Sequence, residues 1–260
     1  MRKYLFAVLI TGLCLPVLAQ KNTPSLKKMK LTGISGSTGI TFDKYNTMSL
    51  DQLTQIARQP ELMRRDLDGL TEEASTQTAG ASLFVNMTFS PHQKSKGTYL
   101  DNLEFRLGVG LNSAKESMVS YKNVDMDTSL VFCNVNSELI LETSYIFKHS
   151  FGKRMFLYFG VGANSSFSVN NEMMIISGKY FSEGEYPSAQ EQAGAITFEA
   201  KPILYSRVFV PWGIHMQASD RVSFGLDFRK GRGLQYTVGE KVNKIANTGA
   251  VMIGTRISFL

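Results

Sequence analysis

The side chains best suited to acid–base chemistry in this 260-residue chain are its three histidines, His92, His149 and His215. An imidazole exchanges protons near neutral pH, and His149 is followed directly by Ser150, a possible nucleophile. The sequence contains no G-x-S-x-G or H-E-x-x-H motif and no cluster of metal ligands that would complete such a site. We therefore expect a non-enzymatic protein without catalytic residues, cofactor or metal.

The two cysteines offer little further chemistry. Cys14 lies in the apolar N-terminal stretch, where the large side chain of Leu13 argues against a lipoprotein signal. Cys133 is then the single cysteine of the mature chain, which cannot form an internal disulfide and has no histidine near it in sequence. We expect Cys133 to be a small, buried, apolar side chain.

The N-terminus has the pattern of an export signal. Arg2 and Lys3 precede an apolar run from Tyr4 to Val17, and a small-residue cleavage pattern ends at Ala19. This pattern predicts a cleaved signal peptide over residues 1–19, a periplasmic segment over 20–30 and a folded domain over 31–260.

Composition narrows the class of protein. Beyond the N-terminus no run approaches the ~18 apolar residues of a membrane-spanning helix. A hydrophobic content of 43% is too high for a disordered chain. The formal net charge of +6 is spread without a lysine and arginine block, so no nucleic-acid partner is expected.

The elements that would position polar side chains are β-strands. Apolar and polar residues alternate over eight segments, seven of them clearly, while glycines interrupt the first. Such alternation places successive side chains on opposite faces of a strand. The segments are 31–42, 81–89, 103–111, 139–147, 155–163, 204–214, 222–228 and 251–259.

The connections alternate between long and short, which is typical of outer-membrane barrels with long extracellular loops and short periplasmic turns. Long connections include 112–136 and 170–194, and short ones include 148–154 and 218–220. The four strands that would run toward the periplasm finish in aromatic residues on their apolar faces, as expected at a membrane interface. These aromatics are Phe89, Tyr145 with Phe147, Trp212 and Phe259.

We therefore predict an all-β fold, an antiparallel up-and-down transmembrane β-barrel of about eight strands, with ten as the alternative count. A soluble β-sandwich is the competing fold. A soluble eight-stranded barrel is disfavoured because its interior could not hold roughly 40 bulky apolar side chains.

In a membrane barrel the polar faces line the lumen, where buried charges need partners. Five acids and five bases fall on these faces, which suggests a closed, mutually neutralising network and leaves a narrow solute channel as an alternative. The predicted network comprises Glu104, Arg106, Glu138, Glu142, Arg207, Asp227, Arg229 and Arg256, and Glu199 and Lys201 complete the ten.

The pattern over residues 28 to 260 resembles the eight-stranded outer-membrane barrels of Gram-negative bacteria, of the OmpA/OmpX-like kind. The final segment Ala250 to Leu260 carries alternating apolar residues and the penultimate aromatic Phe259, one residue from the family's usual terminal position. The resemblance implies an outer-membrane location, surrounding lipid and lipopolysaccharide, and insertion by the barrel assembly machinery. No peptidoglycan-binding domain follows, unlike in the longer OmpA proteins.

The first long connection carries a helical signal. Ser49 and Gln52 resemble a capping box, apolar residues follow at helical spacing, and Pro60 breaks the run. We predict a short helical insertion in the first extracellular loop that either contacts a partner or folds back over its own barrel mouth. The candidate partner contacts are Leu53, Ile56, Leu62, Met63, Arg64 and Arg65.

The expected function is structural or interactive, either in surface adhesion or as a subunit of an envelope complex with a protein partner. A lipid-modifying enzyme that uses His215 is the alternative from another class, since some small barrels act on lipid A or phospholipid. A narrow channel is the third possibility.

Overall fold

The computed structural model describes residues 29–45, 49–77, 79–91, 102–123, 128–152, 154–179, 194–239 and 243–259. The predicted signal peptide over residues 1–19, most of the segment 20–30, His92 and Leu260 lie outside these ranges. No helix in the described ranges is long and apolar enough to cross a membrane.

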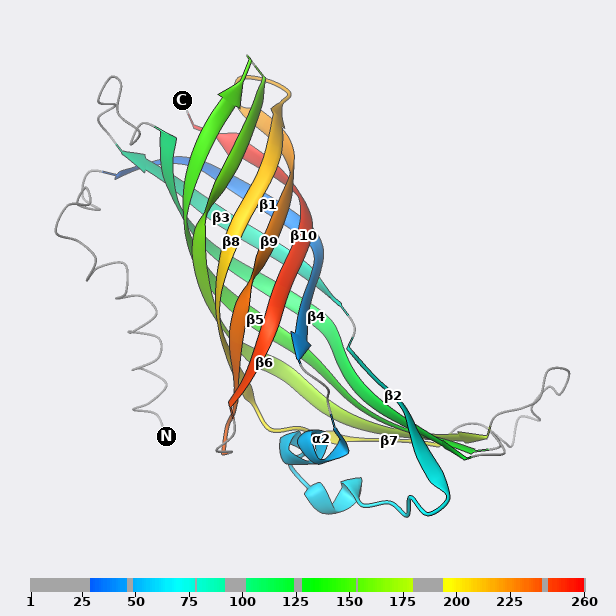
Figure 1. The fold of residues 1–260 in the computed structure, drawn as a ribbon. Helices are drawn as coiled ribbons and strands as arrows, with labels where there is room; N and C mark the ends of the chain where they lie inside the picture. The colour runs from blue at the N-terminus through cyan, green and yellow to red at the C-terminus, as the bar shows by residue number, and fades with distance from the viewer. Residues whose placement is uncertain are drawn as a thin grey trace, which may run out of the picture.

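Eight antiparallel strands close into a ring (Figure 1). Neighbouring strands pair in the order β4-β3-β1-β10-β9-β8-β6-β5, and β5 returns to β4. The ring strands are β1 (Met29–Tyr45), β3 (Gly80–Pro91), β4 (Leu103–Asn123), β5 (Thr128–Phe151), β6 (Met155–Lys179), β8 (Ile203–Gln217), β9 (Val222–Thr237) and β10 (Asn243–Ser258). The structure confirms the predicted antiparallel barrel, and each predicted segment lies in one ring strand.

Pairing of β1 with β10 closes the barrel between the two ends of the described chain, from Gly33 opposite Ser258 to Tyr45 opposite Ala246. Two of the glycines that weakened the pattern of the first segment, Gly33 and Gly39, are required here. A Cβ on Gly39 would lie 2.1 Å from the carbonyl oxygen of Val251. The interruption in sequence therefore marks a close approach of two backbones.

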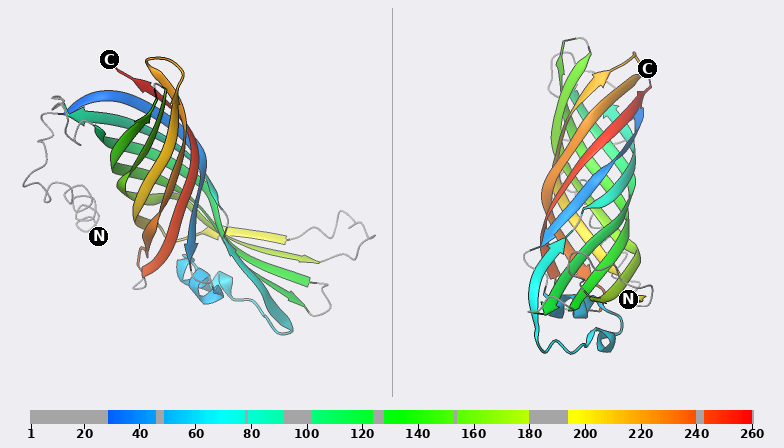
Figure 2. Two further views of the ribbon diagram at one scale, coloured as in Figure 1. Left: turned by 45° about the horizontal axis from the view of Figure 1, so that its top comes forward. Right: turned by 90° about the vertical axis from the view of Figure 1, so that its right-hand side faces the viewer.

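The two predicted long connections 112–136 and 170–194 contain strand, which corrects the prediction. β4 to β6 run on past the barrel and pair there with β2 (Leu70–Gln77) and β7 (Gly194–Glu199), giving ten strands in one sheet (Figure 2). We call the part of this sheet formed by β2, β7 and residues 115–123, 128–137 and 170–179 the extracellular sheet.

Bulges explain why the pattern missed these extensions. Register shifts between Asn112 and Lys115, and again next to Glu138, insert an extra residue in β4 and in β6. An extra residue reverses which of two alternating positions faces inward. In β4 the side chains that face the lumen therefore have even residue numbers on the barrel side of the bulge. Beyond the bulge the odd-numbered Val119 and Tyr121 face inward.

The predicted helical insertion is present as α2 (Leu50–Ile56), followed by the short 3-10 helix η2 (Pro60–Met63). The hydroxyl of Ser49 accepts a hydrogen bond from the backbone N–H of Gln52 at 3.3 Å, which caps α2. After Pro60 the chain forms only the single turn of η2. Gly69 then takes a positive φ of 76° where the chain enters β2.

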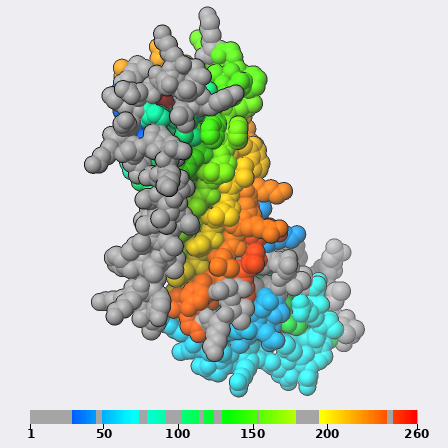
Figure 3. Space-filling model, turned by 60° about the vertical axis from the view of Figure 1, so that its left-hand side comes forward, coloured from blue at the N-terminus to red at the C-terminus, as the bar shows by residue number. Residues whose placement is uncertain are grey.

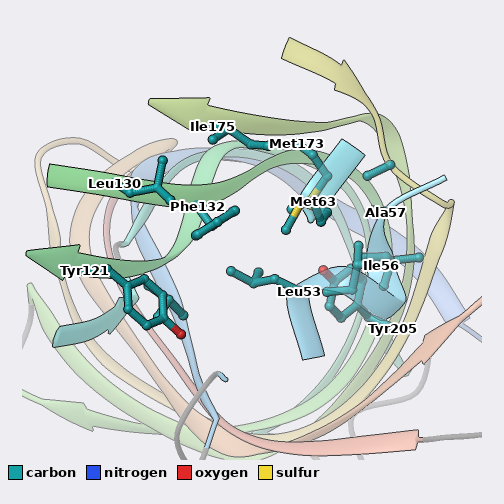
Figure 4. Packing of buried hydrophobic residues seen from close by; sticks show 13 residues of the cluster. Leu53, Ile56, Ala57, Met63, Tyr121, Leu130, Phe132, Met173, Ile175 and Tyr205 are labelled. Atoms are coloured by element: carbon teal, nitrogen blue, oxygen red, sulfur yellow. The ribbon is translucent and has the colours of Figure 1, made fainter. Parts of the chain in front are cut away.

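α2 lies across the extracellular end of the barrel and packs on the extracellular sheet (Figure 4). Leu53 and Ile56 point from the helix toward Phe132, Met173 and the inner face of the sheet. The buried cluster consists of Leu53, Ile56, Ala57, Met63, Val119, Tyr121, Leu130, Phe132, Met173, Ile175, Ala200, Ile203 and Tyr205. The structure thus shows the helix folded back over its own barrel mouth.

Candidate functional site

The outer wall of the ring is apolar. Along β3 the residues alternate strictly between buried and exposed, and large apolar side chains occupy the exposed positions of every ring strand. Val161 of β6 is 62% exposed and Val208 of β8 is 64% exposed. A contiguous exposed apolar surface of this kind is rare on a soluble domain. Lipid is the environment in which such a wall is stable.

Aromatic side chains form a belt around this wall. Phe105 lies between Phe89 and Tyr145, with ring centroids 6.2 and 5.2 Å apart. The belt continues from Phe147 to Phe159 at 5.8 Å. Phe159 is paired with Trp212, which stacks on Phe228 at 5.9 Å. Phe259 is 42% exposed at the end of the chain. The five predicted interface aromatics thus lie on the outer wall, four of them within one belt.

The interior of the barrel is polar and charged. Arg207 of β8 is 8% exposed and lies between two carboxylates. Its guanidinium donates to Asp43 at 2.6 and 3.2 Å and to Glu138 at 2.9 and 3.1 Å. The hydroxyl of Ser166 accepts a hydrogen bond from the same guanidinium at 2.8 Å and donates one to Glu138 at 2.7 Å. This cluster crosses the lumen near its extracellular end and links four strands.

The chain is an eight-stranded outer-membrane β-barrel. An apolar wall outside and paired charges inside reverse the arrangement of a soluble protein, and a closed ring leaves no strand edge in the hydrocarbon. The short turns at 151–152 and 218–221 mark the periplasmic end, and the extracellular sheet lies at the opposite end.

Of the comparisons with known proteins, only the one with solved structures finds similar chains. No protein-family model matches the sequence, and a comparison with curated proteins finds no match. Among solved structures, Neisserial surface protein A is 12% identical over 89% of this chain and 99% of its own, with a TM-score of 0.36. The outer membrane protein OprG of Pseudomonas aeruginosa is 11% identical over 90% and 99%, with a TM-score of 0.35.

A third similar structure is Ail, the attachment invasion locus protein of Yersinia pestis, solved in complex with the heparin analogue sucrose octasulfate. It is 10% identical over 88% of this chain and 97% of its own, with a TM-score of 0.34. These likenesses concern the fold alone, and the assignment above rests on the geometry of the barrel.

A second ion pair crosses the middle of the barrel. Arg229 of β9 binds Glu142 of β5, and its guanidinium lies over the rings of Phe84 and Phe209 at 4.5 and 5.3 Å. The lumen at this level is therefore filled by rings and a paired charge. Arg207 and Arg229 also line a cavity of about 40 Å³.

The periplasmic half of the lumen holds two further carboxylates. Glu104 accepts two hydrogen bonds from Arg256, at 2.7 and 2.8 Å, and lies 2.5 Å from the ammonium of Lys148. Asp227 accepts from Tyr158 and contacts Nε2 of His215 at 2.9 Å.

Arg106 completes the predicted set. Its guanidinium lies 4.6 Å from the centroid of the Tyr158 ring. All eight predicted network residues thus line the lumen. They belong to the clusters around Arg207, Glu104 and Asp227 and to the pair of Arg229 with Glu142.

Two further charges that the sequence predicted for the lumen, Glu199 and Lys201, lie outside it. Glu199 is exposed at the end of β7 and pairs with Arg58, and Lys201 donates to the carbonyl of Gln55 at 2.9 Å outside the lumen. Both lie next to α2, because the chain crosses from the extracellular sheet to β8 at this point. Sequence reasoning missed Asp43 and Lys148, which take their places on the lumen faces of β1 and β5.

The candidate catalytic side chains are not arranged for attack on lipid. His215 is 3% exposed inside the lumen and stacks on Phe156 at 5.1 Å, so its ring faces away from the lipid wall. His149 is exposed at the periplasmic end, beside Phe151. Within the described residues no group of three His, Cys, Asp or Glu side chains could hold a metal ion. Cys133 is buried, as predicted.

The extracellular sheet offers a different surface. Its inner face is covered by α2 and η2, whereas the solvent side of these helices is polar, with Gln55, Arg58, Glu61 and Arg64 exposed. Tyr121 lies at the edge of the buried cluster, where burial and the neighbouring carboxylate of Glu72 raise the pKa of its hydroxyl. The barrel thus carries a folded, helix-backed sheet above the membrane.

Proposed function

We propose that the protein is a non-enzymatic interaction protein of the outer membrane, and that the extracellular sheet with α2 and η2 binds a protein partner. The barrel anchors this platform, and the aromatic belt and charged lumen serve stability. Insertion by the barrel assembly machinery, with the final strand as its signal, is part of the same proposal.

The observation that carries the proposal is the buried cluster beneath α2. Loops that only connect strands need no apolar core, since hairpins of two to five residues suffice. Here three strands continue past the barrel and a helix is fixed on them by side chains such as Leu53 and Phe132, both fully buried. A core of this kind holds surface residues in fixed positions, which lowers the entropy cost of binding.

The residues that we propose for the partner contact differ from those predicted from the sequence. Leu53, Ile56 and Met63 are at most 2% exposed, so their apolar surface is used within the chain. Arg64 is exposed, and Leu62 and Arg65 are half-buried at the end of η2. We place the partner surface on Arg64 together with the exposed Gln55 and Arg58.

The paired charges of the lumen favour an anchoring role over conduction. Arg207 and Arg229 occupy successive levels of the barrel, each bound to carboxylates from other strands. Ion flow past them would require breaking buried pairs, which is costly.

Site-specific photo-crosslinking tests the proposal. A photoreactive amino acid is placed at Gln55 or Arg64, and at Asp220 in an exposed periplasmic turn as the control. On irradiation of intact cells we expect a discrete protein adduct from positions 55 and 64 that is absent from position 220. Adducts of the same mass from all three positions, or none from positions 55 and 64, would contradict the proposal.

A further inference from the structure

Three cations stand together on the outer wall, apart from the lumen network and the platform. Lys44 of β1 is paired with Asn247 of β10, which is paired in turn with Arg232 of β9. Lys230 lies two residues before Arg232, and all four side chains are exposed. Figure 3 shows this side of the barrel, with the orange strand β9 on the surface and parts of β10 and β1 beside it.

These cations point toward the lipid side of the wall. Alternation along β9 puts Lys230 and Arg232 on the same face as Phe224 and Leu226, which are 50% and 42% exposed. Lys44 shares its face of β1 with Phe42. The cluster is therefore continuous with the apolar surface that contacts the membrane.

The position along the strands places the cluster in the extracellular half of the wall, with the exposed Leu234 and Tyr236 of β9 beyond it. Lys230 and Arg232 are the ninth and eleventh residues of β9 from its periplasmic end. Lys44 and Asn247 form the twelfth pair counted from Gly33 and Ser258. A tilted transmembrane strand crosses the hydrocarbon in about 9–11 residues.

Left alone, this arrangement is unfavourable. Cations beside hydrocarbon are costly unless they reach polar groups. Within the described residues, none of the three cations makes an ion pair with a carboxylate of the chain. The neighbours of Arg232 and Lys230 on β8 are Val208 and Val210. Within the part of the chain that the structure describes, no carboxylate compensates these charges, which favours a negative group from outside the chain.

We propose that Lys44, Lys230 and Arg232, with the amide of Asn247, bind phosphate groups of an outer-leaflet lipid. Phosphates lie at the depth that these side chains reach, and long cationic side chains extend along apolar surface to such groups. The guanidinium of Arg232 can hold a phosphate through two hydrogen bonds, and the two lysines add point charges. The lipid chains would then lie along the apolar wall below.

Binding of lipid A to the detergent-solubilised full chain tests this inference. Native mass spectrometry would compare lipid A that carries two phosphates with the same lipid after dephosphorylation. The test variant is Lys230→Gln with Arg232→Gln. The control is Arg154→Gln with Arg221→Gln, an equal loss of charge at exposed periplasmic positions.

We expect the test variant to bind phosphorylated lipid A about 10- to 30-fold more weakly than wild type, and the control to match wild type. The variant Lys230→Arg should retain binding. Heat-modified gel mobility establishes that each barrel is folded. Equal affinity of wild type and test variant, equal binding of the dephosphorylated lipid, or equally tight binding of free inorganic phosphate would overturn the proposal.

Discussion

Replacing Arg207 with methionine is expected to lower the free energy of unfolding by about 3–5 kcal/mol. Methionine keeps much of the volume but removes the cation between Asp43 and Glu138, whose side chains are 5% and 0% exposed. Two carboxylates would then remain in the lumen without the group that neutralises them. Urea unfolding of the purified barrel in lipid vesicles measures the change.

Two controls separate charge from packing. Arg58→Met removes an ion pair with Glu199 whose partners are 60% and 71% exposed, and it should cost less than ~1 kcal/mol. Adding Asp43→Asn and Glu138→Gln to the Arg207→Met variant should recover much of the lost stability, because no unpaired charge remains. A triple variant as unstable as the single one would show that packing against Tyr205, whose ring lies 4.4 Å from the guanidinium, dominates instead.

The second large effect is expected at Leu53→Asp in α2. Leu53 is fully buried, and a carboxylate there would lie among apolar side chains without a hydrogen-bond partner. We expect α2 and η2 to detach from the extracellular sheet while the ring stays folded, because local units of a protein open independently. Hydrogen exchange would show lost protection at the amide of Ala57, which donates to Leu53 at 3.2 Å.

Gln55→Asp is the matched control, since position 55 is exposed on the same helix and receives the same new charge. Its exchange pattern should resemble that of the wild type. Loss of protection in both the ring and the helix of Leu53→Asp would contradict a separable platform. Unchanged protection at Ala57 would contradict the burial of Leu53.

The sequence predicted the barrel because seven of the eight ring strands carry a clear alternation of apolar and polar residues. It failed at the extracellular sheet, where bulges reverse the alternation and Val119 and Tyr121 take over the inward positions. The inner face also changes there from mainly charged to mainly apolar, so a rule that expects charged lumen residues misses it. No local signal in β2 or β7 marks a strand, since both are fixed by pairing with distant partners.

The lumen network was predicted where charges lie within clear alternation, as for Glu142 and Arg229. Asp43 was missed because the predicted first segment ends at Phe42 whereas β1 continues to Tyr45, and Lys148 because β5 continues into an expected turn. Glu199 was misplaced because β7 is short and lies outside the ring. Which charges pair was not predictable, since the contacts join strands far apart in sequence, such as Arg207 with Asp43.

The central claim is that a closed barrel displays a helix-backed platform on the outside of the cell. Labelling of intact cells with a membrane-impermeant maleimide tests it most directly, using Gln55→Cys in the platform and Asp220→Cys in a periplasmic turn. The wild-type chain, in which Cys133 is buried, gives the background level of labelling. We expect Cys at position 55 to be labelled in intact cells and Cys at position 220 only after lysis. Labelling of position 220 but not 55 in intact cells would contradict it.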